Sequence, residues 1–189
     1  MSYPCEEIRP IALSLVAELE PYCQRITVAG SIRREKPHVK DIELVAIPNI
    51  EDMQQLGMFI EDTPAPINLL NAHLDHLRGQ QHIVWRPGSS WGPKSRQFWW
   101  ENRPVDLFQA TKNNWGYQLA LRTGSAKFNL YIMSNLQHRA GIQCKDGYVW
   151  HRESGELIPV PDEETWFFLL GLPYIEPERR IISVIRQHA

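Results

Sequence analysis

The stretch from Val28 to Pro48, VAGSIRREKPHVKDIELVAIP, places two carboxylates inside an apolar run. Asp41 and Glu43 flank Ile42, and four more apolar residues follow. On a β-strand, residues two apart lie on the same face, roughly 6.5–7 Å from each other, so both carboxylates point the same way. Burying a carboxylate is costly unless a positive charge compensates it. The pattern therefore predicts a strand that carries a cation-binding site.

A third acid, Asp106, lies in a later apolar segment, RPVDLFQA. If that strand pairs beside the first, Asp41, Glu43 and Asp106 meet. Mg²⁺ prefers such hard oxygen ligands, and we expect two Mg²⁺ ions here, with Mn²⁺ able to replace them. Two ions about 3.5–4 Å apart form a clamp for phosphoryl or nucleotidyl transfer. Alternatively, the paired acids are a solvated strand face, and Asp106 caps a turn or meets Arg103.

The residues before the acids are suited to bind phosphate. Gly30 allows a close approach of the backbone, successive backbone N–H groups bind anions, and Ser31 adds a hydroxyl donor. Arg34 and Lys40 add positive charge, and the guanidinium fork matches phosphate geometry. The plainer interpretation is a turn followed by a solvated basic surface. The joint pattern favours a triphosphate site next to a metal site.

Bulk properties set limits on the class of protein. The chain has 189 residues, 43% of them hydrophobic, and a net charge of -2, which suits one globular domain or two small ones. Cys5, Cys23 and Cys144 lack the spacing of a zinc site or a disulfide framework, so we expect a reducing compartment. We also expect no signal peptide and no membrane span, and hence a cytoplasmic protein of a bacterium or a virus-infected cell.

The periodicity of apolar residues predicts an α+β fold with a boundary near Ala110. The first part should be a mixed sheet with helices, and the second mostly helical. We expect a turn over 31–38 and helical pieces within 50–79. The expected helices span residues 5–20, 115–122, 126–140 and 163–170. The expected strands span residues 26–29, 40–47, 82–86, 96–100 and 104–110, with weak ones near 143 and at 148–151.

Four segments resemble one family in their order along the chain. AGSIRREKPHVKDIELV is similar to the nucleotidyltransferase signature of family X DNA polymerases, the group of DNA polymerase beta. RPVDLFQA resembles the strand that bears their third metal ligand. GYQLALRTGSAKFNLYIMSNLQHRAGI resembles their thumb segment, and EETWFFLLGLPYIEPERR their C-terminal segment. The resemblance implies a nucleotidyltransferase palm over residues 1–110 and a thumb over 111–189.

The resemblance also implies roles for individual residues. Asp41, Glu43 and Asp106 become metal ligands, and Gly30, Ser31 and Arg34 become triphosphate contacts, with Lys40 as a further candidate. Thr123, Gly124 and Ser125 become a backbone bend beside the sugar of the incoming nucleotide. Asn129 becomes a minor-groove contact to its base. A helix break with Ser125 as N-cap is the plainer interpretation of the Thr-Gly-Ser segment.

The chain departs from the family at several positions. Glu43 stands where aspartate is usual, and Lys40 where glycine is frequent. Leu121 and Arg122 replace an aromatic pair, and Met133 replaces an arginine that contacts the template. These changes predict altered metal spacing and loose base selection. We expect no lyase domain of the kind found in larger relatives, as in the minimal palm–thumb form of some viral members.

The function expected from all this is a DNA-directed DNA polymerase that fills short gaps in repair. Its partners would be primer–template or gapped DNA and deoxynucleoside triphosphates, bound by a monomer. Lys94 and Arg96 are expected to face the nucleic acid. With a net charge of -2, DNA binding should be weak and strongly salt-dependent. Two alternatives stay open: a template-independent nucleotidyltransferase acting on RNA, a protein or a small acceptor, and a DNA-end-binding factor without activity.

Overall fold

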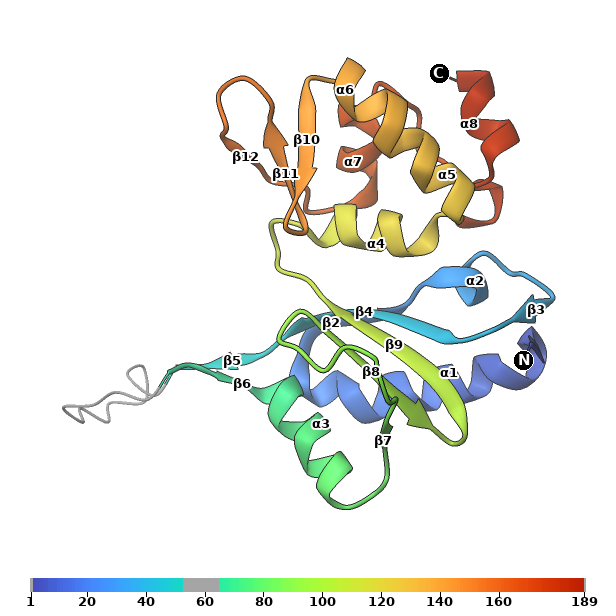
Figure 1. The fold of residues 1–189 in the computed structure, drawn as a ribbon, viewed down its shortest axis with the longest axis vertical. Coiled ribbons are helices and arrows are strands. Elements are labelled where there is room, and N and C mark those ends of the chain that lie inside the picture. Colours follow the sequence, from blue (N-terminus) through green and yellow to red (C-terminus); the bar gives the residue numbers. More distant parts are fainter. Residues whose placement is uncertain (1, 53–64, 189) are drawn as a thin grey trace.

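The computed structural model describes residues 2–52 and 65–188. A five-stranded mixed sheet forms the centre of the first part, in the order β2-β4-β9-β8-β7 (Figure 1). Neighbouring strands are antiparallel except β4 and β9, which are parallel. The strands span Cys23–Val28 (β2), Ile42–Pro48 (β4), Val84–Trp85 (β7), Ser95–Trp100 (β8) and Arg103–Gln109 (β9).

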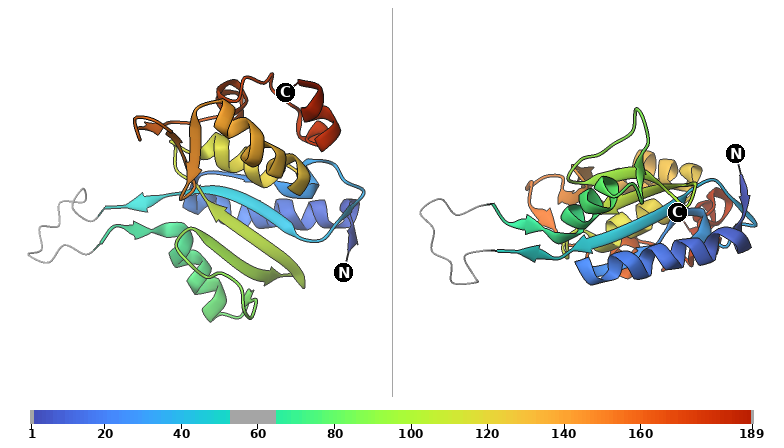
Figure 2. Two further views of the ribbon diagram at one scale, coloured as in Figure 1. Left: turned by 45° about the horizontal axis from the view of Figure 1, so that its top comes forward. Right: turned by 90° about the horizontal axis from the view of Figure 1, so that it is seen from below.

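The two faces of this sheet have different coverings. Helices α1 (Cys5–Leu19) and α3 (Leu69–Gly79) pack on one face, against Leu44 and its neighbours on β4 and β9. Val45 points to the opposite face, because alternate strand residues alternate in direction, and there it packs under helix α4 (Trp115–Thr123). Glu43, two residues before Val45, therefore lies on the α4 side of the sheet. Figure 2 shows α1 and α4 on opposite sides of the sheet.

The second part of the chain lies above the first in Figure 1 and has its own core of buried side chains. The larger hydrophobic clusters draw on residues 8–107 and 117–185 respectively. The helices of the second part are α4, α5 (Ala126–Tyr131), a π-helical segment (Ile132–Leu136), α6 (Gln137–Arg139), α7 (Glu163–Leu169) and α8 (Ile182–His188). A small antiparallel sheet joins β10 (Ile142–Lys145), β11 (Tyr148–His151) and β12 (Leu157–Ile158).

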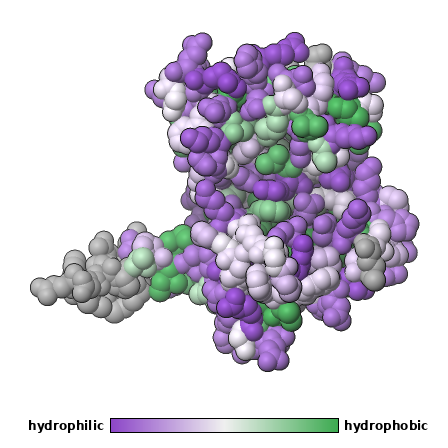
Figure 3. All heavy atoms as spheres, in the orientation of Figure 1, coloured by the Kyte–Doolittle hydropathy of each residue, from purple (hydrophilic) through white to green (hydrophobic). Residues whose placement is uncertain are grey.

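Short elements complete the fold. Strand β1 pairs with β3, and β5 pairs with β6. They span Tyr3–Pro4 (β1), His38–Val39 (β3), Ile50–Glu51 (β5) and Ile67–Asn68 (β6), with a helical turn α2 at Gly30–Arg33 and 3-10 turns at Glu20–Tyr22 and Pro177–Arg179. Hydrophilic side chains cover most of the face in Figure 3. Within the described ranges, no helix is long and apolar enough to cross a membrane.

The mixed α+β class is confirmed, and most elements lie where the sequence predicts them. Several details differ. Residues 30–33 form the helical turn α2 where a turn over 31–38 was expected, and the helix expected over 126–140 contains the π-helical segment. Helix α8 and the short strands β1, β3 and β12 were not expected. Part of the helical interpretation of 50–79 falls on residues 53–64, outside the described residues; around them lie β5, β6 and α3.

Candidate active site

The register of the central sheet brings two of the predicted acids side by side. Glu43 on β4 is the direct neighbour of Asp106 on β9, and adjacent strands lie about 4.8 Å apart. Asp41 directly precedes β4. All three side chains are partly buried. The parallel pairing of β4 and β9 thus gathers the acids from positions more than sixty residues apart in sequence.

The charges of these acids act on one another. Burial, followed by the charge of Asp41, raises the pKa of Glu43 to about 7. Burial and the charge of Asp106 also raise the pKa of Asp41. Both shifts disfavour the ionised form because water is excluded and like charges face each other. A cation placed among the three carboxylates would relieve both effects.

The side chains as they stand do not form a closed metal site. In the described parts of the chain, no group of three or more His, Cys, Asp or Glu side chains is arranged to hold a metal ion. Asp106 has other partners: its Oδ1 accepts hydrogen bonds from Arg86 (2.7 Å) and Gln97 (3.0 Å). The donor set itself, three carboxylates with mutual repulsion, fits a hard divalent cation.

Gly30 is required by the conformation next to Glu43. Its φ of +63° lies in the left-handed region that side chains disfavour. A Cβ at this position would lie only 1.9 Å from Oε2 of Glu43. The backbone N–H of Ala29 donates to the carbonyl of Glu43 (2.8 Å) and holds the two segments together. The Gly-Ser turn therefore lies directly against the carboxylate site.

Arg33 and Arg34, which follow the Gly-Ser turn, form hydrogen bonds with the second part of the chain. Arg34 donates to the carbonyl oxygen of Thr123, at the end of α4. Burial lowers the pKa of Arg34, and the negative charges of Glu43 and Asp41 oppose this shift. The guanidinium group of Arg34 therefore lies near both acids. Arg33 donates to the hydroxyl of Thr123 (2.8 Å). These bonds connect α2, beside the acids, with the Thr-Gly-Ser segment.

Arg33 also belongs to a buried charge network that sequence reasoning missed. It donates to both carboxylate oxygens of Glu163, the first residue of α7. Arg180, whose exposed fraction is 0%, donates to Glu163 as well and to the carbonyl of Ile175 (2.9 Å). Burial would raise the pKa of Glu163, but the hydrogen bonds from Arg33 and Arg180 outweigh it and hold the pKa below its ordinary value. Glu163 could not be singled out from the sequence, because acidic residues are common at the N-termini of helices.

The Thr-Gly-Ser segment ends one helix and begins the next. Gly124 follows α4, and Ser125 occupies the N-cap position of α5 without a side-chain capping bond. Asn129 folds back: its Nδ2 donates to the carbonyls of Leu121 (2.6 Å) and Gly124 (3.2 Å). A Cβ on Gly124 would lie 2.2 Å from the Asn129 Oδ1. The amide nitrogen of Asn129 is thus engaged within the chain, and its contact with a base stays a prediction.

Arg122 forms a further contact between the two parts. Its guanidinium carbon lies 3.6 Å from the ring centroid of Phe108, which follows Asp106 by two residues on β9 and shares its face. Burial lowers the pKa of Arg122, and the charges of Glu43 and Asp106 oppose the shift. Arg122 therefore places an additional cation beside the acids.

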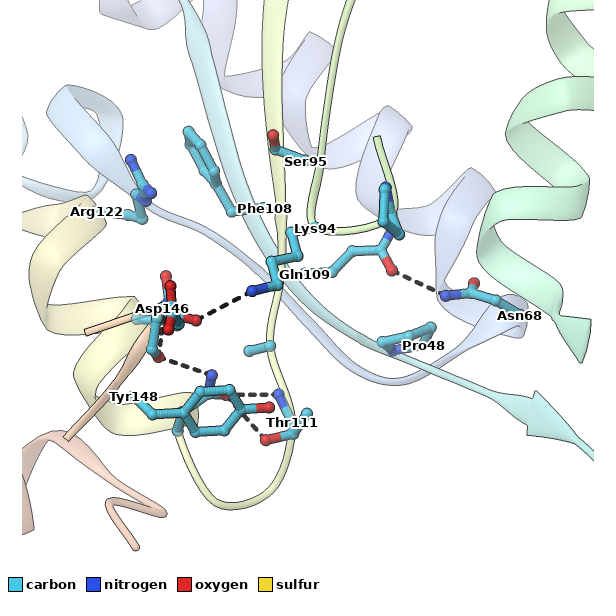
Figure 4. A pocket seen from close by; sticks show the side chains of 15 residues that line it. Pro48, Asn68, Lys94, Ser95, Phe108, Gln109, Thr111, Arg122, Asp146 and Tyr148 are labelled. Carbon is cyan, nitrogen blue, oxygen red and sulfur yellow. Dashed lines mark hydrogen bonds between the residues drawn. The ribbon is translucent and has the colours of Figure 1, made fainter. Parts of the chain in front are cut away.

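The remaining candidates differ in their surroundings. Lys40 is exposed, and its charge lowers the pKa of Asp41 against the effect of burial. Lys94 is exposed and donates to the backbone carbonyl of Asp146 (3.3 Å); both residues line a pocket between β9 and the second part of the chain (Figure 4). The expectation that Arg96 faces nucleic acid is wrong for this structure. Arg96 is 7% exposed and donates to both carboxylate oxygens of Asp75 (2.7 and 3.2 Å). Its side chain is therefore turned toward helix α3, which carries Asp75.

Comparison with known proteins locates a relationship in the second part of the chain. Residues 118–181 match the family model described as the DNA polymerase beta thumb. No curated protein matches the chain significantly. The match supports a relationship to family X polymerases of the DNA polymerase beta type, and it points to a DNA-binding, polymerase-like protein. The segment it covers includes the Thr-Gly-Ser bend, Glu163 and Arg180.

Proposed function

We propose that the chain is a metal-dependent, DNA-directed DNA polymerase of the minimal palm–thumb form. In this proposal residues 1–110 are the palm and residues 111–189 the thumb. The observation that carries it is the pairing of Glu43 with Asp106 on parallel strands, next to Asp41, in a chain whose following segment matches the polymerase beta thumb. Neither feature alone would select a polymerase.

The acids would be the metal ligands. Asp41, Glu43 and Asp106 would hold two Mg²⁺ ions, or Mn²⁺ in their place. When bound, the ions would neutralise the carboxylates and the nucleotide phosphates and lower the pKa of the primer 3′ hydroxyl. The raised pKa values of Asp41 and Glu43 support this assignment, since the nearby cations do not offset burial and the repulsion between the acids.

The residues around the acids would bind the nucleotide. The backbone N–H groups at Gly30 and Ser31 would donate to the phosphates, as at other turns that begin a helix. Arg34 would exchange its bond with the carbonyl of Thr123 for a phosphate oxygen. The bend at Thr123–Ser125 would lie beside the deoxyribose, and Lys40, exposed next to Asp41, would add charge.

The chemical step is a nucleotidyl transfer. The primer 3′ oxygen attacks the α-phosphorus of the nucleotide, a P–O bond forms, and the bond to the β-phosphate oxygen breaks to release pyrophosphate. Asp106 would take the proton of the 3′ hydroxyl at Oδ2. Within the described residues no hydrogen bond to this oxygen is found, whereas Oδ1 already accepts two.

The partners of this reaction would be primer–template or gapped DNA and the four deoxynucleoside triphosphates. A monomer with a net charge of -2 should make few phosphate contacts and bind DNA weakly, and its affinity should fall with salt in proportion to the number of those contacts. Lys94 stays a candidate for such contacts; Arg96 does not, because it is paired with Asp75. Short-gap repair in the cytoplasm of a bacterium or of a virus-infected cell is the setting we propose.

Primer extension with and without a template strand tests this function. The proposal predicts Mg²⁺-dependent addition of the nucleotide complementary to the template, and negligible addition to a single strand. Equal addition without template would favour a template-independent nucleotidyltransferase, which shares the carboxylate chemistry. Tight binding of DNA ends without any transfer would favour the end-binding factor. Either of these last two results would refute the polymerase proposal.

A further inference from the structure

One carboxylate oxygen of Asp106, Oδ1, accepts hydrogen bonds from two side chains. The Nη1 of Arg86 lies 2.7 Å from Oδ1, and the Nε2 of Gln97 lies 3.0 Å from it. A carboxylate offers about four lone-pair positions, two on each oxygen. The two donors therefore occupy Oδ1, and the described residues provide no hydrogen bond to Oδ2. The carboxylate is therefore held through one oxygen, and the described residues leave the other without a hydrogen bond.

The two donors come from positions that the sheet fixes. Gln97 is the direct neighbour of Asp106 across β8 and β9, so both side chains lie on the same face. Arg86 comes directly after β7, and its backbone N–H donates to the carbonyl of Gln97 (3.3 Å). The backbone N–H of Ser89 donates to the carbonyl of Arg86 (3.1 Å) and closes a turn behind it. Arg86 is therefore anchored on both sides.

The partial burial of both side chains strengthens the ion pair between Arg86 and Asp106. The side chains of Arg86 and Asp106 are 28% and 16% exposed, so water screens their attraction only in part. Arg86 belongs to none of the segments that resemble a polymerase motif.

We infer that Arg86 is a positioning residue that, together with Gln97, fixes the Asp106 carboxylate through Oδ1 and leaves Oδ2 for the metal ion and the primer hydroxyl. The inference rests on the proposed function. A ligand that is held by outer hydrogen bonds loses less freedom when it binds metal, and such outer contacts typically contribute about 10- to 100-fold to metal affinity or activity. A rival role for the same contact is that of a competitor, in which Arg86 occupies the site and must leave before an ion binds.

Steady-state incorporation by Arg86→Gln and Arg86→Lys separates these roles. Positioning predicts that Arg86→Gln lowers kcat on the order of 10- to 100-fold, while the KM for the nucleotide changes less than about twofold, since Arg86 contacts no nucleotide-binding residue. Arg86→Lys should recover part of kcat because a donor returns. Arg9→Gln, which removes an exposed arginine from the face of the sheet that carries α1, is the matched control and should equal the wild type. An unchanged or raised kcat in Arg86→Gln would overturn the inference.

A second readout does not depend on turnover. In ¹⁵N-labelled wild-type protein, the side-chain amide of Gln97, assigned by its loss in Gln97→Met, should keep its hydrogen-bonded shift when Mg²⁺ is added. Movement to the shift of a free amide would show that the ion displaces the donors, and the positioning role would be wrong. If the wild type transfers no nucleotide, the proposed function fails and this inference fails with it. A low kcat confined to the Arg86 variants supports both the proposed function and the positioning role of Arg86.

Discussion

The buried charge network at Glu163 gives the sharpest prediction about stability. Glu163 is 5% exposed and accepts hydrogen bonds from Arg33 and from Arg180, which is fully buried. Glu163→Gln keeps the shape of the side chain but removes its charge, so two partly or fully buried guanidinium groups lose their counter-ion. Breaking a buried pair in this way costs about 3–5 kcal/mol. That is a large part of a typical stability of about 5–15 kcal/mol.

Urea unfolding followed by tryptophan fluorescence measures the effect. Glu164→Gln is the matched control, because Glu164 is the next residue on the same helix and is exposed; we expect it to change stability by less than about 0.5 kcal/mol. The network also predicts a pH dependence. Since the folded-state pKa of Glu163 lies below its ordinary value, its contribution is present above about pH 4.3 and is lost as the pH falls through the folded-state pKa. A Glu163→Gln protein within about 1 kcal/mol of wild type, with the same acid sensitivity, would refute this reasoning.

Two further substitutions test the glycine and the asparagine beside the site. Gly30→Ala should destabilise the fold and displace Glu43, because the new Cβ would lie 1.9 Å from Oε2 of Glu43 at a φ of +63°; wild-type thermal stability would contradict it. Asn129→Ala removes hydrogen bonds to the carbonyls of Leu121 and Gly124, so thermal unfolding should show a loss of about 1–3 kcal/mol. If Asn129 also turns to the base, the KM for all four nucleotides should rise by similar factors, roughly 2- to 13-fold; an effect on one nucleotide alone would rule out a general minor-groove contact.

The elements that carry the acids could be predicted from sequence because they depend on local pattern. An apolar run marks both β4 and β9, and an acid inside each run is conspicuous. The placement of Asp41, Glu43 and Asp106 near one another followed from assuming that the two strands pair, which the parallel register confirms for Glu43 and Asp106. The Thr-Gly-Ser segment was expected as a helix break, and Ser125 does occupy the N-cap position.

The partners of the charged side chains could not be predicted, since they come from distant parts of the chain. Arg86 precedes Asp106 by 20 residues, and Arg33 precedes Glu163 by 130. No spacing rule connects such pairs. The error at Arg96 has the same origin: its partner Asp75 lies 21 residues away on α3, and a basic residue beside a turn looks exposed until that helix is placed. The π-helical segment within 132–136 likewise leaves no mark in the apolar spacing.

The measurement that tests the central claim most directly is single-turnover incorporation into a one-nucleotide gap, with Mg²⁺, by wild type, Asp41→Ala and the control Glu153→Ala. Asp41 belongs to a like-charged cluster, so its removal should leave the fold intact and can stabilise the metal-free protein. Glu153 is exposed and lies in the second part of the chain. We expect the wild type and Glu153→Ala to insert the templated nucleotide at the same rate, and a folded Asp41→Ala to insert none. Equal incorporation by Asp41→Ala would contradict the assignment of the carboxylates as the catalytic centre.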